Sequence, residues 1–110
     1  MIIEFRMHRD RGWLNFVREH PCMLRIPHVC TGDRNSSVPA HSNHQRHGRG
    51  IGSKSHDVFA VPACNECHLW YDSGKAGREE KYDAFQMAIE RFWLYLARKG
   101  LTQWRPKPGA

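Results

Sequence analysis

Four cysteines in this sequence have the residue type and the spacing of a tetrahedral metal site. Cys64 and Cys67 form a Cys-x-x-Cys turn, which presents two thiolates from one knuckle because amides of the turn can donate to the sulfurs. Cys22 and Cys30 are more widely spaced, so the loop between them must bring them together. Zn²⁺ prefers four soft ligands at tetrahedral angles. The sequence therefore predicts one structural zinc, held by all four cysteines.

Other interpretations of the cysteines remain open. A redox function is disfavoured because no βαβ pattern surrounds the Cys-x-x-Cys turn. Disulfides are disfavoured in the cytoplasm, where thiols stay reduced. Either His20 or His28 could replace one cysteine as a ligand. The cysteines could also be buried thiols beside a turn that binds no metal.

A second group of residues with metal-binding chemistry follows the Cys-x-x-Cys turn. A helix that begins in this turn would project His68 and Asp72 from one face, because they are one helical turn apart. An imidazole and a carboxylate so placed can chelate one divalent cation. Upstream, His41 ends a strand-like segment and Asp57 precedes another. Taken singly, each of these residues is also typical of an ordinary polar surface.

The hydrophobic pattern predicts the helices that position these residues. Apolar residues at helical spacing predict a short helix over residues 10–20, which Pro21 ends, and another over residues 65–73. The longest helix is expected over residues 78–99, with Gly100 as its C-terminal cap. A stripe on that helix is expected in the core, and it consists of Tyr82, Phe85, Ala88, Ile89, Phe92, Trp93 and Leu96.

Short β-type fragments, broken by turn residues, lie between the first two helices. Short strands and knuckles are expected over residues 23–26, 31–35 and 37–41, and a further strand is expected over residues 58–61. Residues 43–57 are too polar to pack and too rich in glycine to be helical, so they predict a mobile basic loop. The expected fold class is α+β, with helices at both ends of a small zinc-stapled core.

The length of 110 residues allows one domain, expected over residues 1–103, with a disordered tail over residues 104–110. A chain of this size buries only about two-thirds of the surface it exposes when unfolded. A metal staple would therefore add needed stability.

Composition and charge narrow the class of protein. The chain is 25% charged, has no run near the roughly 20 apolar residues of a membrane span and lacks a signal-like start, so we expect a cytoplasmic protein without a membrane partner. The net charge of +6 favours a polyanion such as DNA as partner, although a solvated cationic face is the alternative. Monomer and homodimer are both compatible with the sequence.

The order of these motifs resembles the zinc-containing HNH, or ββα-metal, endonucleases. The shared features are a histidine at the end of a strand, a loop, a polar residue before a second short strand, and Cys-x-x-Cys-His at the start of a helix. More narrowly, residues 22–32, 40–41 and 63–68, together with Asp72, resemble a family of small phage and prophage nucleases. The resemblance runs over residues 13–101.

The resemblance implies a role for each matching residue. His41 occupies the place of the general base that deprotonates the attacking water, and His68 that of a ligand to the catalytic cation, Mg²⁺ or Mn²⁺. Asp72 stands where a further ligand is expected. Asp57 fills the central asparagine position, where it would orient His41, support the loop or bind the metal.

One position departs from the family pattern. The residue before the base is usually a metal-binding aspartate or histidine, and here it is Ala40. The ligand is missing unless Asp57, Asn43 or His44 replaces it.

The basic loop is the expected contact surface for DNA. Arg46, Arg49 and Lys54 could neutralise phosphates without reading bases, although they could equally be solvated charges of a loop. The function that these features favour is metal-dependent DNA endonuclease. A zinc-stapled DNA-binding module without activity, and a phage structural or interaction protein, are the alternatives.

Overall fold

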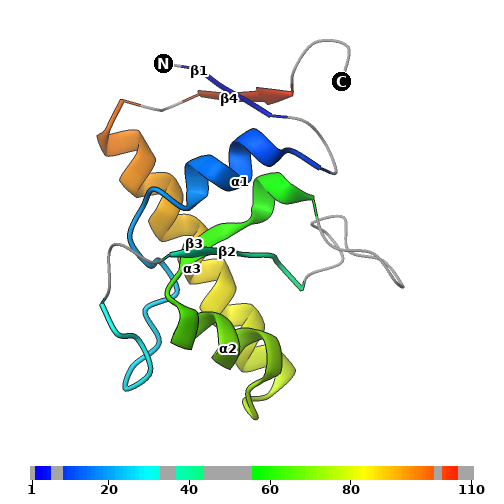
Figure 1. Ribbon diagram of the computed structural model, residues 1–110, viewed down its shortest axis with the longest axis vertical. Helices are drawn as coiled ribbons and strands as arrows, with labels where there is room; N and C mark the ends of the chain where they lie inside the picture. Colours follow the sequence, from blue (N-terminus) through cyan, green and yellow to red (C-terminus); the bar gives the residue numbers. More distant parts are fainter. Residues whose placement is uncertain (1, 6–8, 33–36, 44–55, 101–102, 107–110) are drawn as a thin grey trace.

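The structure, a computed structural model, describes residues 2–5, 9–32, 37–43, 56–100 and 103–106 (Figure 1). Its helices are α1 (Arg11–Val17), α2 (Asn65–Ser73), α3 (Arg78–Arg98) and the short 3₁₀ helix η2 (Asp57–Phe59). Its strands are β1 (Ile2–Phe5), β2 (Val38–Ala40), β3 (Val61–Ala63) and β4 (Gln103–Pro106). This is a small α+β fold, as the sequence predicted. None of the helices in these described ranges is long and apolar enough to span a membrane.

The centre of the fold is the antiparallel pair β2–β3, followed directly by α2. Ala40 pairs with Val61, so the end of β2 lies beside the start of β3. Every residue of β3 is buried, because α3 packs behind the strand pair (Figure 1). The other edge of β3 also contacts the cysteine-rich segment, since the amide of Met23 donates to the carbonyl of Pro62 at 2.7 Å.

Helix α3 supplies most of the core, as its apolar stripe predicted. Its buried residues are Phe85, Ala88, Ile89, Phe92 and Leu96. Trp13 of α1 packs edge-on against Phe92, with ring centroids 6.2 Å apart. Trp93, expected in the core, is instead 41% exposed. It directly follows Phe92, and consecutive side chains on a helix point about 100° apart.

The ends of α1 and α3 have local causes. The Asp10 carboxylate accepts a hydrogen bond from the amide of Trp13 at 3.0 Å and so caps α1. Helix α1 is shorter than predicted, because residues 18–20 form a turn before Pro21. Gly100 has φ +85° just after α3, the left-handed conformation that glycine adopts without strain, which confirms it as the cap.

Two predicted strands are wrong or displaced. Residues 23–26 form no strand, because they bend around the cysteine site and Arg25 has φ +48°. The strand expected over residues 58–61 begins three residues later as β3, because η2 occupies residues 57–59. The expected strand over residues 37–41 is confirmed in its centre as β2.

The C-terminal segment is also more ordered than predicted. Residues 103–106 form β4, which pairs in parallel with β1 and aligns Ile2 with Gln103. A disordered tail from residue 104 is therefore wrong for residues 104–106, while residues 107–110 lie outside the described residues. The pairing joins segments that are about 100 residues apart, so no local sequence pattern predicts it. Most of the predicted basic loop, residues 44–55, also lies outside the described residues.

Candidate active site and metal centre

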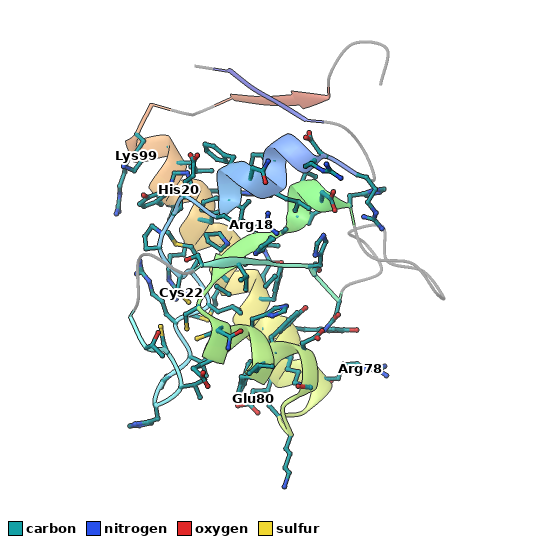
Figure 2. The ribbon with its side chains drawn as sticks, in the orientation of Figure 1. Arg18, His20, Cys22, Arg78, Glu80 and Lys99 are labelled. Atoms are coloured by element: carbon teal, nitrogen blue, oxygen red, sulfur yellow. The ribbon has the colours of Figure 1, made fainter. Side chains whose placement is uncertain are left out.

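The four cysteines come together as the sequence predicted. Their sulfur atoms all lie within 4.8 Å of one another, and all four thiols are free. Cys22, Cys64 and Cys67 are buried and Cys30 is half-buried. Figure 2 shows Cys22 where the cysteine-rich segment meets the start of α2. This donor set of four unbridged thiols, three of them buried, fits one tetrahedral zinc ion.

Helices α2 and α3 hold the cysteine group in place. Cys64 is the N-cap of α2, and its sulfur accepts a hydrogen bond from the amide of Cys67 at 3.5 Å. Arg91 of α3 donates to the carbonyl of Met23, so the longest helix braces the turn that follows Cys22. With the bond between Met23 and Pro62, this contact holds Cys22 beside the end of β3.

The loop from Cys22 to Cys30 turns back through unusual backbone geometry. The carbonyl of Ile26 accepts from the amides of Val29 and Cys30, at 3.1 and 2.9 Å. His28 has φ +65°, a left-handed conformation that is uncommon outside glycine. The return brings the Cys30 sulfur to 4.0 Å from that of Cys64.

The pKa values of Cys64, Cys67 and Cys30 are shifted in different directions. Burial raises the pKa of Cys64, but hydrogen bonds from Thr31 and Cys67 outweigh burial and lower it to about 6. Burial raises the pKa of Cys67 and of Cys30, and the neighbouring sulfurs add to the effect. The Cys64 thiolate is thus favoured before a metal binds, whereas a metal must displace protons from Cys67 and Cys30.

The histidines that could have replaced a cysteine lie apart from this group. His20 is half-buried, its ring packs against Phe16 and Phe92, and its Nδ1 lies 3.2 Å from the hydroxyl of Tyr95. Burial lowers the pKa of His20, with Glu19 and Lys99 acting in opposite directions. Of the residues that the structure describes, only the four cysteines form a metal-sized group.

His41 and Asp57 meet directly, although they are far apart in the sequence. His41 Nε2 lies 2.8 Å from Asp57 Oδ1, and the His41 side chain is 19% exposed while that of Asp57 is 2% exposed. Because an ionised carboxylate only accepts, the imidazole is the donor. This contact can hold the imidazole ring in one orientation, in which Nδ1 points away from Asp57.

Asp57 also binds the start of α1, which the sequence did not predict. Arg9 Nη1 donates to Asp57 Oδ1 at 3.1 Å, and the amide of Asp10 donates to Oδ2 at 2.6 Å. Both carboxylate oxygens are thus engaged by donors, so Asp57 is poorly placed to bind a cation.

His68 and Asp72 occupy successive turns of α2, as predicted. Asp72 is exposed, His68 is half-buried, and Asp72 lines a surface pocket of about 390 Å³ with Asn43, Arg78, Lys81 and other residues. Asp72 therefore faces the segment that follows His41. Among the described residues, no third protein ligand lies together with His68 and Asp72.

Two tyrosines fix the segment after His41, and sequence reasoning missed both. The amide of Asn43 donates to the Tyr71 hydroxyl at 2.6 Å, and the Tyr82 hydroxyl donates to the Asn43 carbonyl at 3.2 Å. Tyr71 follows Cys67 by one helical turn on the buried face of α2, and this spacing was the available signal. His44, Arg46, Arg49 and Lys54 lie outside the described residues.

The fold and the site together define a class of small α+β proteins with a four-cysteine centre. The fold is similar to a solved structure described as "Structure of a putative bacteriophage protein from Escherichia coli str. K-12 substr. MG1655". The TM-score is 0.58 at 24% identity, and the match covers 77% of this chain and 95% of that one.

The sequence comparison is more specific. The model of the family described as "Putative nuclease YbcO" matches residues 15–95, so this chain belongs to that family. Curated relatives named "Putative nuclease YbcO" from Escherichia coli (strain K12) and "Putative nuclease ybcO" from Enterobacteria phage 82 are each 42% identical over 53 residues. Each match covers 47% of this chain, which spans only about half, 53%, of each relative.

Proposed function

We propose that this chain is a metal-dependent DNA endonuclease of HNH type, encoded by a phage or prophage and used in recombination or other DNA processing. The observation that carries the proposal is the contact of His41, at the end of β2, with the buried carboxylate of Asp57. The order β2, β3, α2 supports a ββα-metal core, and family membership supports nuclease activity.

In this proposal His41 is the general base. Its Nε2 carries the proton donated to Asp57, so Nδ1 keeps a lone pair that can take a proton from water. Asp57 fixes the tautomer and stabilises the imidazolium that forms, as the carboxylate does in other His-Asp pairs. Its bonds to Arg9 and Asp10 favour this orienting role over metal binding.

His68 and Asp72 would hold the catalytic cation, Mg²⁺ or Mn²⁺. Two protein ligands fit such an ion, which usually retains waters and binds substrate phosphate. When bound, the cation would polarise the phosphodiester and stabilise the leaving oxygen. Ala40 cannot contribute, and its side chain is wholly buried. The four cysteines would hold a structural zinc, since four thiolates leave no open position.

Plasmid DNA tests the proposal directly. Nicking or linearisation of a supercoiled plasmid should require added Mg²⁺ or Mn²⁺, and filter binding should detect the complex with DNA. Binding without cutting would instead support a zinc-stapled DNA-binding module, the alternative that Ala40 favours. The absence of both cutting and binding would support an interaction protein.

Substitution of the proposed cation ligands should produce a metal-dependent defect. His68→Ala and Asp72→Ala should raise the Mn²⁺ concentration needed for half-maximal cleavage, because each removes one ligand, and excess Mn²⁺ should partly restore the rate. Asp83→Ala removes an exposed carboxylate from α3 and should leave the metal requirement unchanged. Equal metal requirements in all these proteins would contradict the assignment.

Binding to DNA should weaken steeply with salt, because each neutralised phosphate releases condensed counterions. Joint replacement of Arg46, Arg49 and Lys54 by alanine should reduce the slope of log affinity against log salt by about 0.9 for each phosphate that is no longer neutralised. Fluorescence anisotropy of a labelled duplex measures both slopes. Arg98→Ala, at the far end of α3, is the charge control, and a flat salt dependence in the wild type would refute the expectation.

A further inference from the structure

Arg9 reaches the His41–Asp57 pair from outside the family-matched residues 15–95. Its Nη1 and His41 Nε2 bind the same atom, Asp57 Oδ1, at 3.1 and 2.8 Å. The guanidinium and the imidazole therefore lie within two hydrogen-bond lengths of each other. The N-terminal segment thus places a cation beside the proposed base.

We propose that Arg9 is a further substrate-contacting residue, which binds a non-bridging oxygen of the phosphodiester on which His41 acts. This inference rests on the nuclease function proposed above. The guanidinium stays on Asp57 and also donates to the phosphate.

Exposure and hydrogen-bonding capacity support this assignment. The Arg9 side chain is 52% exposed, whereas Asp57 is 2% exposed, so the guanidinium extends from the buried carboxylate toward the surface. A guanidinium carries five N–H donors in a planar fork, which suits a carboxylate and a phosphate together. A fixed cation beside the phosphate stabilises negative charge that develops during hydrolysis.

The backbone holds Arg9 in place independently of substrate. The next residue, Asp10, donates its amide to Asp57 Oδ2 and caps α1 with its own carboxylate. The backbone beside Arg9 is thus fixed both by the buried Asp57 and by the start of α1. A purely structural Arg9 would affect stability, whereas a phosphate contact would affect the rate of cleavage by folded protein.

The test compares Arg9→Ala and Arg9→Lys with Arg18→Ala, which removes the same charge from an exposed position just after α1. Plasmid nicking with Mn²⁺ gives kcat and KM, and thermal unfolding defines a temperature at which every variant is folded. Arg9→Ala should lower kcat/KM by about 10²-fold, through a lower kcat and a higher KM, because the contact is made in the bound substrate and strengthens as negative charge develops. Arg9→Lys, which keeps the charge but not the fork, should fall between Arg9→Ala and wild type. Arg18→Ala should keep the wild-type kcat.

A wild-type kcat in Arg9→Ala, or equal losses in Arg9→Ala and Arg18→Ala, would overturn the inference. Should Arg9→Ala not fold, Arg9→Lys decides, and a wild-type kcat in that variant would overturn it. If the wild type itself cuts no DNA, the proposed function fails, and DNA affinity then tests the phosphate contact of Arg9. Anisotropy with a labelled duplex, without added Mg²⁺ or Mn²⁺, should then show a larger loss for Arg9→Ala than for Arg18→Ala, and equal affinities would overturn the phosphate contact.

Discussion

Removal of zinc should unfold this protein. Binding of structural zinc by cysteine-rich sites is worth roughly 10–16 kcal/mol at neutral pH, while a whole domain is stable by only about 5–15 kcal/mol. Here the four sulfurs lie on the loop after α1, the end of β3 and the start of α2, so loss of a zinc ion would remove the bonds that link these three segments. Circular dichroism should show loss of helix when a strong chelator is added, and re-added zinc should restore it.

Cys67→Ser should have the same effect without a chelator, because Cys67 is wholly buried and supplies one of four sulfurs. Ser73→Ala, an exposed position on the same helix, should leave folding and zinc content unchanged. Elemental analysis should find one zinc per chain. Protein purified without chelator that is folded yet free of zinc would contradict the prediction.

Replacement of His41 by alanine should remove most DNA cleavage and leave zinc content and folding intact. A general base contributes about 10²–10⁴-fold to the rate, so the loss should be large. Because a base acts on water and not on the metal, extra Mn²⁺ should not restore the rate. Plasmid nicking under single-turnover conditions measures this step, with the zinc content determined on the same samples.

His28→Asn is a matched control for His41→Ala. It removes an exposed histidine from a backbone with φ +65°, which asparagine tolerates, and it should cut at the wild-type rate. Cleavage by His41→Ala at the wild-type rate would show that the base is assigned wrongly, and the HNH proposal would lose its centre.

Asp57→Asn separates an orienting role of that residue from a metal-binding role. Asparagine replaces an acceptor-only carboxylate with an amide that can also donate to His41, so the tautomer is no longer fixed, and such a change in a Ser-His-Asp triad costs about 10⁴-fold. We expect a large loss of cleavage that Mn²⁺ does not reverse. Recovery at high Mn²⁺ would indicate that Asp57 binds the cation after all.

Features that depend on near neighbours in the chain could be predicted from the sequence. The bounds of α2, the start of α3 and the glycine cap after α3 follow from helical periodicity and from the freedom of Gly100 at positive φ. The pairing of Cys64 with Cys67 is equally local, because one turn carries both sulfurs. Most of the α3 stripe is buried as expected, since a helix needs one apolar face to pack.

Contacts between distant segments could not be predicted from the sequence, because they form only when the elements pack together. Nothing near Arg9 or Asp10 in the sequence indicates that both donate to Asp57, since that bond forms only when α1 packs against η2. The bend of residues 23–26 replaced an expected strand because Pro62 and Arg91 bind its backbone around the cysteine site. β4 likewise exists only as the partner of β1. Hydrophobic periodicity records which face of an element is buried, but not which distant element covers it.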